Sequence, residues 1–330
     1  MDIFKDSKVQ FAIDAVREAA ILADRVQQEL VVESLTKGDR SPVTVADFTA
    51  QAVIAERLRN AFPDAQLVGE ESSADLREAE GAKTSKQVTQ FVNTVFEGTS
   101  EKEVWEWIDQ GDNEPGKAFW TLDPVDGTKG FLRKEQYAVA LALIEDGEVQ
   151  IGALGCPHIR KGHQIDIGGE GSLILAVRGE GSWVRPLRRE AEWKALSVSV
   201  QTDRTRARLL RSAEAAHTDL GSMDAIAQHL GIGSDPVRMD SQAKYSVLAS
   251  GEGELLFRLI SPKSPDYKEK IWDQAAGSIV VEEAGGRISD LDGRDLDFTK
   301  GRMLLNNRGV LASNGLLHNE ALQAIKATQA

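Results

Sequence analysis

Two apolar runs near the middle of the chain, 137–144 and 149–154, flank the turn-forming stretch 145–147. Apolar runs on either side of a short turn that contains Gly predict a β-hairpin. The apolar run 173–177, followed by the turn-forming residues 179–181 and then Trp183, predicts a second hairpin. Consecutive hairpins indicate antiparallel pairing and argue against the regular alternation of a βαβ barrel.

Helical periodicity dominates the first third of the chain. Apolar residues recur at three- and four-residue steps over 9–30 and again from about Asp47 to Ala61, which predicts two amphipathic helices. The charge-rich segment 73–117 holds a further helical pattern over 88–96. Later elements are also predicted: helices near 223–230, 241–249 and 274–284, and a strand at 254–259. We therefore expect an α/β (α+β) fold of layered helices and mixed or antiparallel sheets.

The composition excludes several kinds of partner. A net charge of −13 and the absence of a block of Lys and Arg argue against a nucleic acid. No apolar window of about 18 residues is present, and the first thirty residues carry charges throughout, so we expect neither a membrane span nor a signal peptide. Cys156 is the single cysteine, so no intramolecular disulfide or Cys/His zinc site is expected. These features favour a cytoplasmic protein and leave import into an organelle open.

Acidic residues stand at four separated places in the sequence: Asp47, Glu70 with Glu71, Asp123 with Asp126, and Asp273. Each has a purely structural alternative, because aspartate caps helices and is common in turns. Helix caps are the alternative for Asp47 and Asp273, and a surface charge is the alternative for Glu71. Glu70 and Asp123, however, stand where a strand-like run gives way to a loop, which is the usual placement of functional groups.

Magnesium accounts for this choice of residues. Mg²⁺ takes oxygen ligands, commonly from carboxylates and from phosphate groups. Pro124 fixes the backbone between Asp123 and Asp126, so the carbonyl of Val125 is available as a further ligand. Gly127 lets a phosphate approach the backbone closely. The pattern predicts a magnesium-dependent phosphatase that acts on a small phosphate monoester.

Three segments, 69–72, 120–128 and 272–277, read GEES, WTLDPVDGT and WDQAAG. They resemble the signature motifs of the lithium-sensitive, magnesium-dependent phosphatases related to inositol monophosphatase, and their order and spacing also match. This resemblance spans nearly the whole chain. It implies an inositol monophosphatase-like fold, two or more Mg²⁺ ions as cofactors, and inhibition by Li⁺.

Three further segments, 41–47, 240–245 and 269–273, resemble one branch of that superfamily, the 3′(2′),5′-bisphosphate nucleotidases of fungal and plant type. The resemblance implies removal of the 3′-phosphate from 3′-phosphoadenosine 5′-phosphate and from its sulfated form. The expected partner is therefore a small nucleotide bisphosphate, and we expect a monomer. We also expect two lobes, an N-terminal metal-binding α+β lobe over 1–160 and a C-terminal α/β lobe over 161–330.

The resemblance implies a role for each site residue. The metal ligands would be Glu70, Asp123, Val125, Asp126 and Asp273. Asp47 and Thr128 would orient and deprotonate the attacking water, although Thr128 has an alternative as a helix cap. Contacts with the substrate are implied for Gly127, Thr128, His217, Ser241, Lys244 and Arg258. The structural alternative for His217 and Lys244 is an ordinary surface or core residue.

Other functions stay open at this point. Inositol polyphosphate 1-phosphatase or inositol monophosphatase activity would use the same metal motifs, although the segment 240–245 favours the nucleotide. A non-catalytic nucleotide-binding sensor would keep the pocket but would lack metal-site residues, and none is missing here. A structural calcium-binding protein is disfavoured because the compact acidic loop of an EF-hand does not occur.

Overall fold

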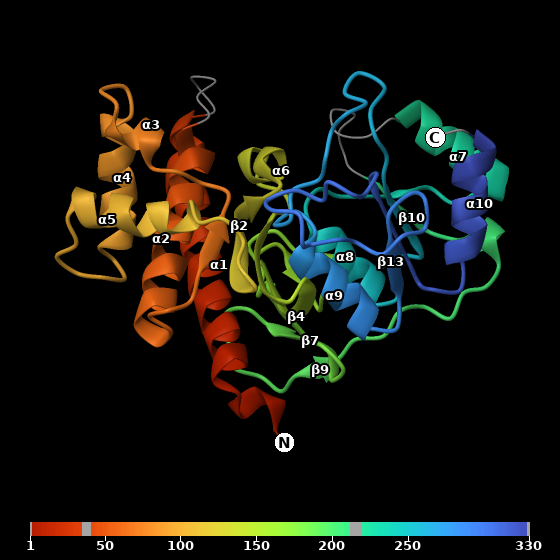
Figure 1. Ribbon diagram of the computed structural model, residues 1–330, viewed down its shortest axis with the longest axis horizontal. Coiled ribbons are helices and arrows are strands. Elements are labelled where there is room, and N and C mark those ends of the chain that lie inside the picture. Colours follow the sequence, from red (N-terminus) through yellow and green to blue (C-terminus); the bar gives the residue numbers. More distant parts are fainter. Residues whose placement is uncertain (1, 35–40, 212–219, 329–330) are drawn as a thin grey trace.

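The structure is a computed structural model that describes residues 2–34, 41–211 and 220–328. Figure 1 shows helices and sheets in alternating layers, with the N-terminal helices at one end and α7 and α10 at the other. The layered α/β architecture expected from the sequence is therefore confirmed, and it contains mixed sheets. None of the described helices has the length and apolar character that crossing a membrane requires.

The outer helical layer consists of two long helices that pack on each other, α1 (Ser7–Ser34) and α2 (Ser41–Ala61). Smaller helices are attached to this end of the molecule: η1 (Ile3–Lys5), α3 (Ala74–Arg77), α4 (Ala82–Val92), α5 (Glu101–Ile108) and η2 (Asp109–Gly111). The expected helix over 88–96 thus lies one turn earlier in the chain. A capping box between Ser100 and Glu103 starts α5, in a stretch whose apolar pattern gave no clear prediction.

A seven-stranded sheet follows, with the order β1-β2-β3-β4-β7-β8-β9. Its strands are β1 (Leu67–Gly69), β2 (Ala118–Asp126), β3 (Ala138–Glu145), β4 (Glu148–Cys156), β7 (Ser172–Val177), β8 (Gly181–Pro186) and β9 (Lys194–Ala195). The pairs β3–β4 and β7–β8 are the two predicted hairpins. β1 and β2 run parallel, whereas the other neighbouring strands of this sheet pair antiparallel.

The seven-stranded sheet is covered on both faces, and this explains the unbroken apolar run of β3. Val139 and Leu141 belong to the core shared with α1 and α2, whereas Ala140 and Ala142 belong to the core on the opposite face. That second core is built around α8 (Ala243–Ala249) and α9 (Ala275–Glu283).

A five-stranded sheet lies beyond α8 and α9, with the order β11-β10-β12-β14-β13. Its strands are β10 (Leu209–Arg211), β11 (Val237–Arg238), β12 (Leu255–Arg258), β13 (Arg287–Ser289) and β14 (Val310–Ser313). The remaining elements are α6 (Thr128–Leu132), the pair β5 (Ile159–Arg160) and β6 (Gln164–Ile165), η3 (Arg204–Arg206), α7 (Leu220–Leu230) and α10 (His318–Thr328).

The sheets change later in the chain than residue 160. Strands up to Ala195 still pair within the seven-stranded sheet, and Leu209 opens the five-stranded one. The division into two lobes over 1–160 and 161–330 stays a prediction.

The start of α2 differs from the sequence prediction. The helix begins at Ser41 and not at about Asp47. The polar stretch with Pro42 looked like a break, but proline is tolerated in the first turn of a helix, where its missing N–H has no intrahelical partner to lose. Asp47 consequently lies inside the helix.

Candidate active site

A cleft of about 320 Å³ brings together residues that are far apart in the sequence. Its walls come from the ends of β1, β2 and β12 and from the starts of α6, α8 and α9. Ten of the predicted site residues line it: Glu70, Asp123, Val125, Asp126, Gly127, Thr128, Ser241, Lys244, Arg258 and Asp273. His217 lies outside the described residues.

The parallel pairing of β1 with β2 places two carboxylates side by side. Gly69 stands opposite Leu122 in the register, so the next residues along the two strands are Glu70 and Asp123. Parallel strands end at the same edge of a sheet, and both side chains therefore enter the cleft from that edge.

The segment after Asp123 turns sharply toward the cleft. The register between β2 and β3 shifts between Asp123 and Asp126, where Pro124 has no N–H for the ladder. Gly127 then adopts a left-handed conformation with φ of 98°, and it has no room for a side chain, because an added Cβ would stand 2.9 Å from the Cβ of Ser241. Only glycine fits this position without strain.

The helix-cap alternatives do not hold for three of the residues. Asp47 lies in the interior of α2, Gln274 is the N-cap of α9 beside Asp273, and Gly127 is the N-cap of α6 beside Thr128. Their side chains are thus available for other contacts. Asp47 does not line the cleft, but it is near enough to Asp123 and Glu70 for their charges to interact.

Negative charge is crowded in this region. Desolvation and then neighbouring charges, led by Glu70, raise the pKa of Asp123 well above its ordinary value. Glu70 keeps contact with solvent in the cleft, where desolvation by the walls and then repulsion from Glu71 and Asp126 raise its pKa to about 7. Burial raises the pKa of Asp273 to about 8, although a nearby guanidinium opposes the shift.

Asp47 shares this electrostatic environment. The side chain is only 8% exposed, and burial followed by the charges of Glu71 and Glu70 raises its pKa well above the usual range. A carboxyl with a raised pKa is a better proton acceptor once ionised, which suits a general base.

Two cations face the carboxylates. Burial lowers the pKa of Lys244 to about 8, and the charge of Asp126 partly offsets that effect. One Nη atom of Arg258 lies 2.7 Å from Oε2 of Glu269 and 3.8 Å from Oδ2 of Asp273. The cleft therefore holds both signs of charge, as a site for metal ions and a phosphorylated ligand requires.

The donor set fits a hard divalent cation. It consists of oxygen atoms, and Oδ1 of Asp123 is buried without a hydrogen-bond partner among the described residues. A buried oxygen of this kind needs a partner, and a cation would supply one. Within those same residues, no three His, Cys, Asp or Glu side chains stand ready-made as a ligand set.

Several residues at the cleft had no role predicted from the sequence. Lys129, Asp240, Tyr267 and Lys270 also line it. Two of them, Asp240 and Lys270, fall inside segments that carry the resemblance to the nucleotidases. That resemblance could have pointed to them, although no role was predicted for either residue. Lys129 directly follows Thr128 in the sequence, and this adjacency to a predicted site residue could have indicated it.

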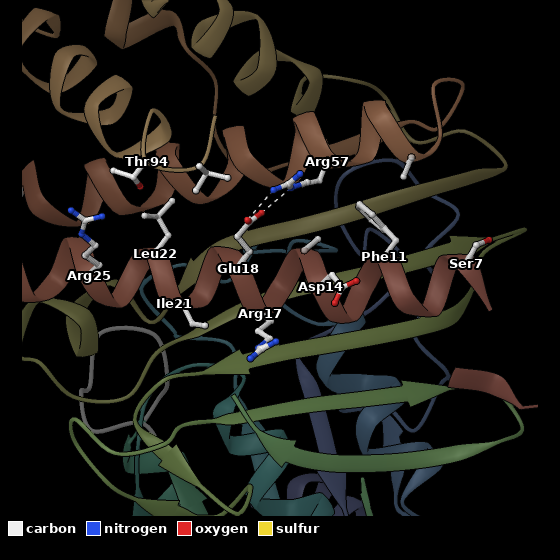
Figure 2. A pocket seen from close by; sticks show the side chains of 13 residues that line it. Ser7, Phe11, Asp14, Arg17, Glu18, Ile21, Leu22, Arg25, Arg57 and Thr94 are labelled. Carbon is white, nitrogen blue, oxygen red and sulfur yellow. Dashed lines mark hydrogen bonds and ion pairs between the residues drawn. The ribbon is translucent and has the colours of Figure 1, made fainter. Parts of the chain in front are cut away.

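A larger hollow of about 770 Å³ lies along α1 and α2, away from the carboxylate cleft. Figure 2 shows its labelled side chains, in which Arg57 pairs with Glu18 across the two helices. Nε and Nη2 of Arg57 lie 2.9 and 3.0 Å from the two carboxylate oxygens of Glu18. Size alone does not identify the functional site here, because this hollow lacks the clustered acids.

The fold and the carboxylate cleft are those of a phosphatase of the inositol monophosphatase class. Residues 5–330 match the inositol monophosphatase family, and the chain belongs to that family. The solved structures of the extragenic suppressor protein suhB from Bartonella henselae and of CysQ from Bacteroides thetaiotaomicron share the fold, each with a TM-score of 0.63 and 18% identity. The alignments cover 97% of this chain and 100% of suhB, and 95% of this chain and 99% of CysQ.

Within this family, the chain is similar to curated nucleotidases. A 3′(2′),5′-bisphosphate nucleotidase of Schizosaccharomyces pombe is 40% identical over 98% of this chain and 96% of its own length. Proteins of the same name are 41% identical in Emericella nidulans, over 94% of this chain and 95% of the relative, and 39% identical in Oryza sativa, over 94% and 91%. The resemblance to fungal and plant nucleotidases that the motifs indicated is confirmed.

Proposed function

We propose that this protein hydrolyses the 3′-phosphate of 3′-phosphoadenosine 5′-phosphate, giving AMP and phosphate, and acts on the sulfated form of that nucleotide. The observation that carries the proposal is the meeting of Glu70, Asp123, Asp126 and Asp273 in one cleft with Lys244 and Arg258. The curated relatives carry the name of this activity at about 40% identity.

The carboxylates supply the metal site in this proposal. Glu70, Asp123, Asp126 and Asp273, with the Val125 carbonyl, would hold two or more Mg²⁺ ions, which stabilise charge on phosphoryl oxygens and lower the pKa of water. The unpartnered Oδ1 of Asp123 supports this assignment.

Asp47 and Thr128 would prepare the attacking water. The exposed hydroxyl of Thr128 would donate its proton toward the carboxylate of Asp47 and accept a hydrogen bond from the water. The proton that the water loses would pass through Thr128 to Asp47, so the reaction needs no covalent enzyme intermediate.

The cations would recognise the nucleotide. Lys244 and Arg258 lie beside the carboxylates, and Lys129 and Lys270 line the same cleft, so its charge suits a ligand with two phosphates. Ser241 holds a left-handed backbone conformation with φ of 68°, which is rare for a residue other than glycine and suits a position fixed against a ligand. His217, which lies outside the described residues, stays a prediction for this part of the site.

The main alternative within the family is a phosphatase for inositol phosphates, and a non-catalytic nucleotide sensor is the alternative of another class. Phosphate release from 3′-phosphoadenosine 5′-phosphate, inositol 1-phosphate and inositol 1,4-bisphosphate separates them. We expect turnover of the nucleotide with Mg²⁺, loss of it in EDTA, and inhibition by Li⁺. Faster turnover of an inositol phosphate, or nucleotide binding without phosphate release, would contradict the proposal.

A further inference from the structure

Arg302 lies between β13 and β14, far in the sequence from the residues of the cleft, and its guanidinium contacts two of the cleft's supporting segments. Nη2 donates to the carbonyl of Gly69. Nη1 donates to the carbonyls of Gly111 and Asn113, each at 3.1 Å. The centre of the guanidinium also lies 4.9 Å from the ring centroid of Trp272.

The contacted residues directly precede two of the acids. Gly69 is followed by Glu70, and Trp272 is followed by Asp273. One planar side chain therefore touches the backbone that carries one carboxylate and the aromatic ring that neighbours another. A guanidinium can do both at once, because its fork donates in plane while its face stacks on a ring.

The backbone of Arg302 is itself fixed to the segment before Asp273. The N–H of Ile271 donates to the carbonyl of Arg302 at 3.2 Å, and the N–H of Leu304 donates to the carbonyl of Glu269 at 2.9 Å. The adjacent residues Lys270 and Met303 form an antiparallel bridge. These contacts join Arg302 to the segment that carries Asp273.

The Glu70 loop is held from its other side by Gln51 of α2. Nε2 of Gln51 donates to the carbonyl of Glu71 at 2.6 Å, and Oε1 accepts from the N–H of Glu71 at 3.1 Å. A Cβ added to Gly69 would stand 2.4 Å from Oε1 of Gln51, so the loop has no room on this side. The loop is thus clamped between Gln51 and Arg302.

We propose that Arg302 is a positioning residue that couples Glu70 to Asp273 and thereby sets the affinity of the cleft for Mg²⁺. The proposal rests on the proposed function for the identity of the cation. Mg²⁺ demands near-ideal octahedral geometry, so its affinity depends on how well separate ligands are held relative to one another. Partners behind metal ligands typically contribute about 10- to 100-fold in affinity or activity.

The test uses Arg302→Lys and Arg302→Gln, with Arg178→Lys as the matched control. Arg178 also donates to a backbone carbonyl, that of Val149 at 3.1 Å, and pairs with Glu282. Neither of these two partners directly precedes a carboxylate of the cleft, whereas Gly69 and Trp272 do. The readout is the Mg²⁺ concentration that gives half of the maximal rise in melting temperature, measured without substrate. Steady-state kinetics at each Mg²⁺ concentration supply KM and kcat.

For both Arg302 variants we expect this Mg²⁺ concentration to rise by about 10-fold or more. We also expect most of kcat to return at saturating Mg²⁺, with KM for the nucleotide little changed. Arg178→Lys should match the unaltered protein. An unchanged Mg²⁺ requirement in the Arg302 variants would overturn the proposal, and so would failure of both variants to fold in EDTA, which would mark a purely structural role.

The two proposals fail in different ways. A Mg²⁺-dependent rise in melting temperature without phosphate release from the nucleotide would contradict the proposed function and leave the role of Arg302 testable. Absence of any Mg²⁺-dependent stabilisation in the unaltered protein would contradict both.

Discussion

The backbone N–H of Gln242 donates a hydrogen bond of 2.5 Å to Oδ2 of Asp126, 116 residues away in the sequence. The side chain of Gln242 continues the connection, because Nε2 donates to the carbonyl of Trp272 and Oε1 accepts from the N–H of Gly277, each at 2.9 Å. Gln242 is 1% exposed. It therefore joins the loop of Asp126 to the segment of Asp273 and the start of α9.

Replacing Gln242 with Met keeps the size of the side chain and removes both amide contacts. The carbonyl of Trp272 and the N–H of Gly277 would then lack these partners, and each loss costs about 1–3 kcal/mol when the group stays buried. We expect a lower free energy of unfolding by urea denaturation in EDTA. Gln150→Met, at a partly exposed strand position, is the control and should change stability little. Equal stability of the two variants would refute the linking role of Gln242.

Asp123→Asn should separate the functional role of this residue from a structural one. The variant keeps the shape of the side chain but removes a negative charge from the crowded cleft. We expect turnover to fall by more than about 100-fold, since loss of a partner behind a metal ligand already costs about 10- to 100-fold. Stability in EDTA should be kept or increased, because the variant removes the burial of a charged group and its repulsion from neighbouring carboxylates, the two causes that raise the pKa of Asp123.

Asp64→Asn on the exposed surface is the matched control for Asp123→Asn and should retain turnover. Circular dichroism and urea denaturation in EDTA follow the fold of both variants. An unfolded Asp123→Asn protein would favour a structural role for this carboxylate.

Stability of the metal-free protein should fall as the pH rises through neutrality. Glu70 and Asp273 have folded-state pKa values raised to about 7 and about 8, above those of the unfolded chain. The unfolded state then binds fewer protons than the folded state across this interval. The contribution of these two groups to the free energy of unfolding is therefore complete below about pH 4 to 5 and is lost toward about pH 8. Urea denaturation in EDTA from about pH 5 to 8.5 measures the loss.

Mg²⁺ should reduce this loss, because a bound dication stabilises the ionised carboxylates. The same titration with Mg²⁺ present provides the comparison. Parallel pH profiles with and without Mg²⁺ would be incompatible with a cation held by these two groups.

His318 should produce the opposite pH dependence. The ring is fully buried between the hydroxyls of Ser313 and Ser289, at 2.8 and 2.9 Å, and burial followed by the charge of Arg287 lowers its pKa to about 4. The unfolded state binds more protons between this value and the ordinary pKa of about 6.5, so stability is lost as the pH falls through that range.

Replacing His318 with Asn, which does not titrate, tests this assignment. Urea denaturation between about pH 4 and 7 should show a flatter profile for His318→Asn than for the unaltered protein. His163→Asn is the control, since His163 is partly exposed and its removal should leave the slope in place. Identical slopes for all three proteins would rule out His318 as the source.

Sequence patterns could predict those parts of the fold that are determined by residues close together in the sequence. The hairpin of β3 and β4 follows from local alternation and turn residues, and the carboxylates at the ends of β1 and β2 stand at visible changes from strand to loop. The resemblance of the signature segments to known phosphatases predicted that the distant acids share one site. The start of α2 at Ser41 was missed because Pro42 both ends and begins helices.

The supporting contacts of the cleft could not be predicted from the sequence. Arg302 contacts Gly69 across 233 positions and Gln242 contacts Asp126 across 116, and no local spacing encodes such pairs. Gln51 presented a similar difficulty, because a polar residue within a helical pattern is normally exposed. These residues become visible only when the layers that bring them together are known.

Anomalous diffraction from crystals soaked in Mn²⁺, a cation that prefers the same oxygen ligands, would show whether the four separated acids bind divalent cations together. We expect two or more anomalous peaks in the cleft, bound by oxygens of Glu70, Asp123, Asp126 and Asp273. Peaks confined to other parts of the surface, or a cleft without a peak at saturating Mn²⁺, would contradict it.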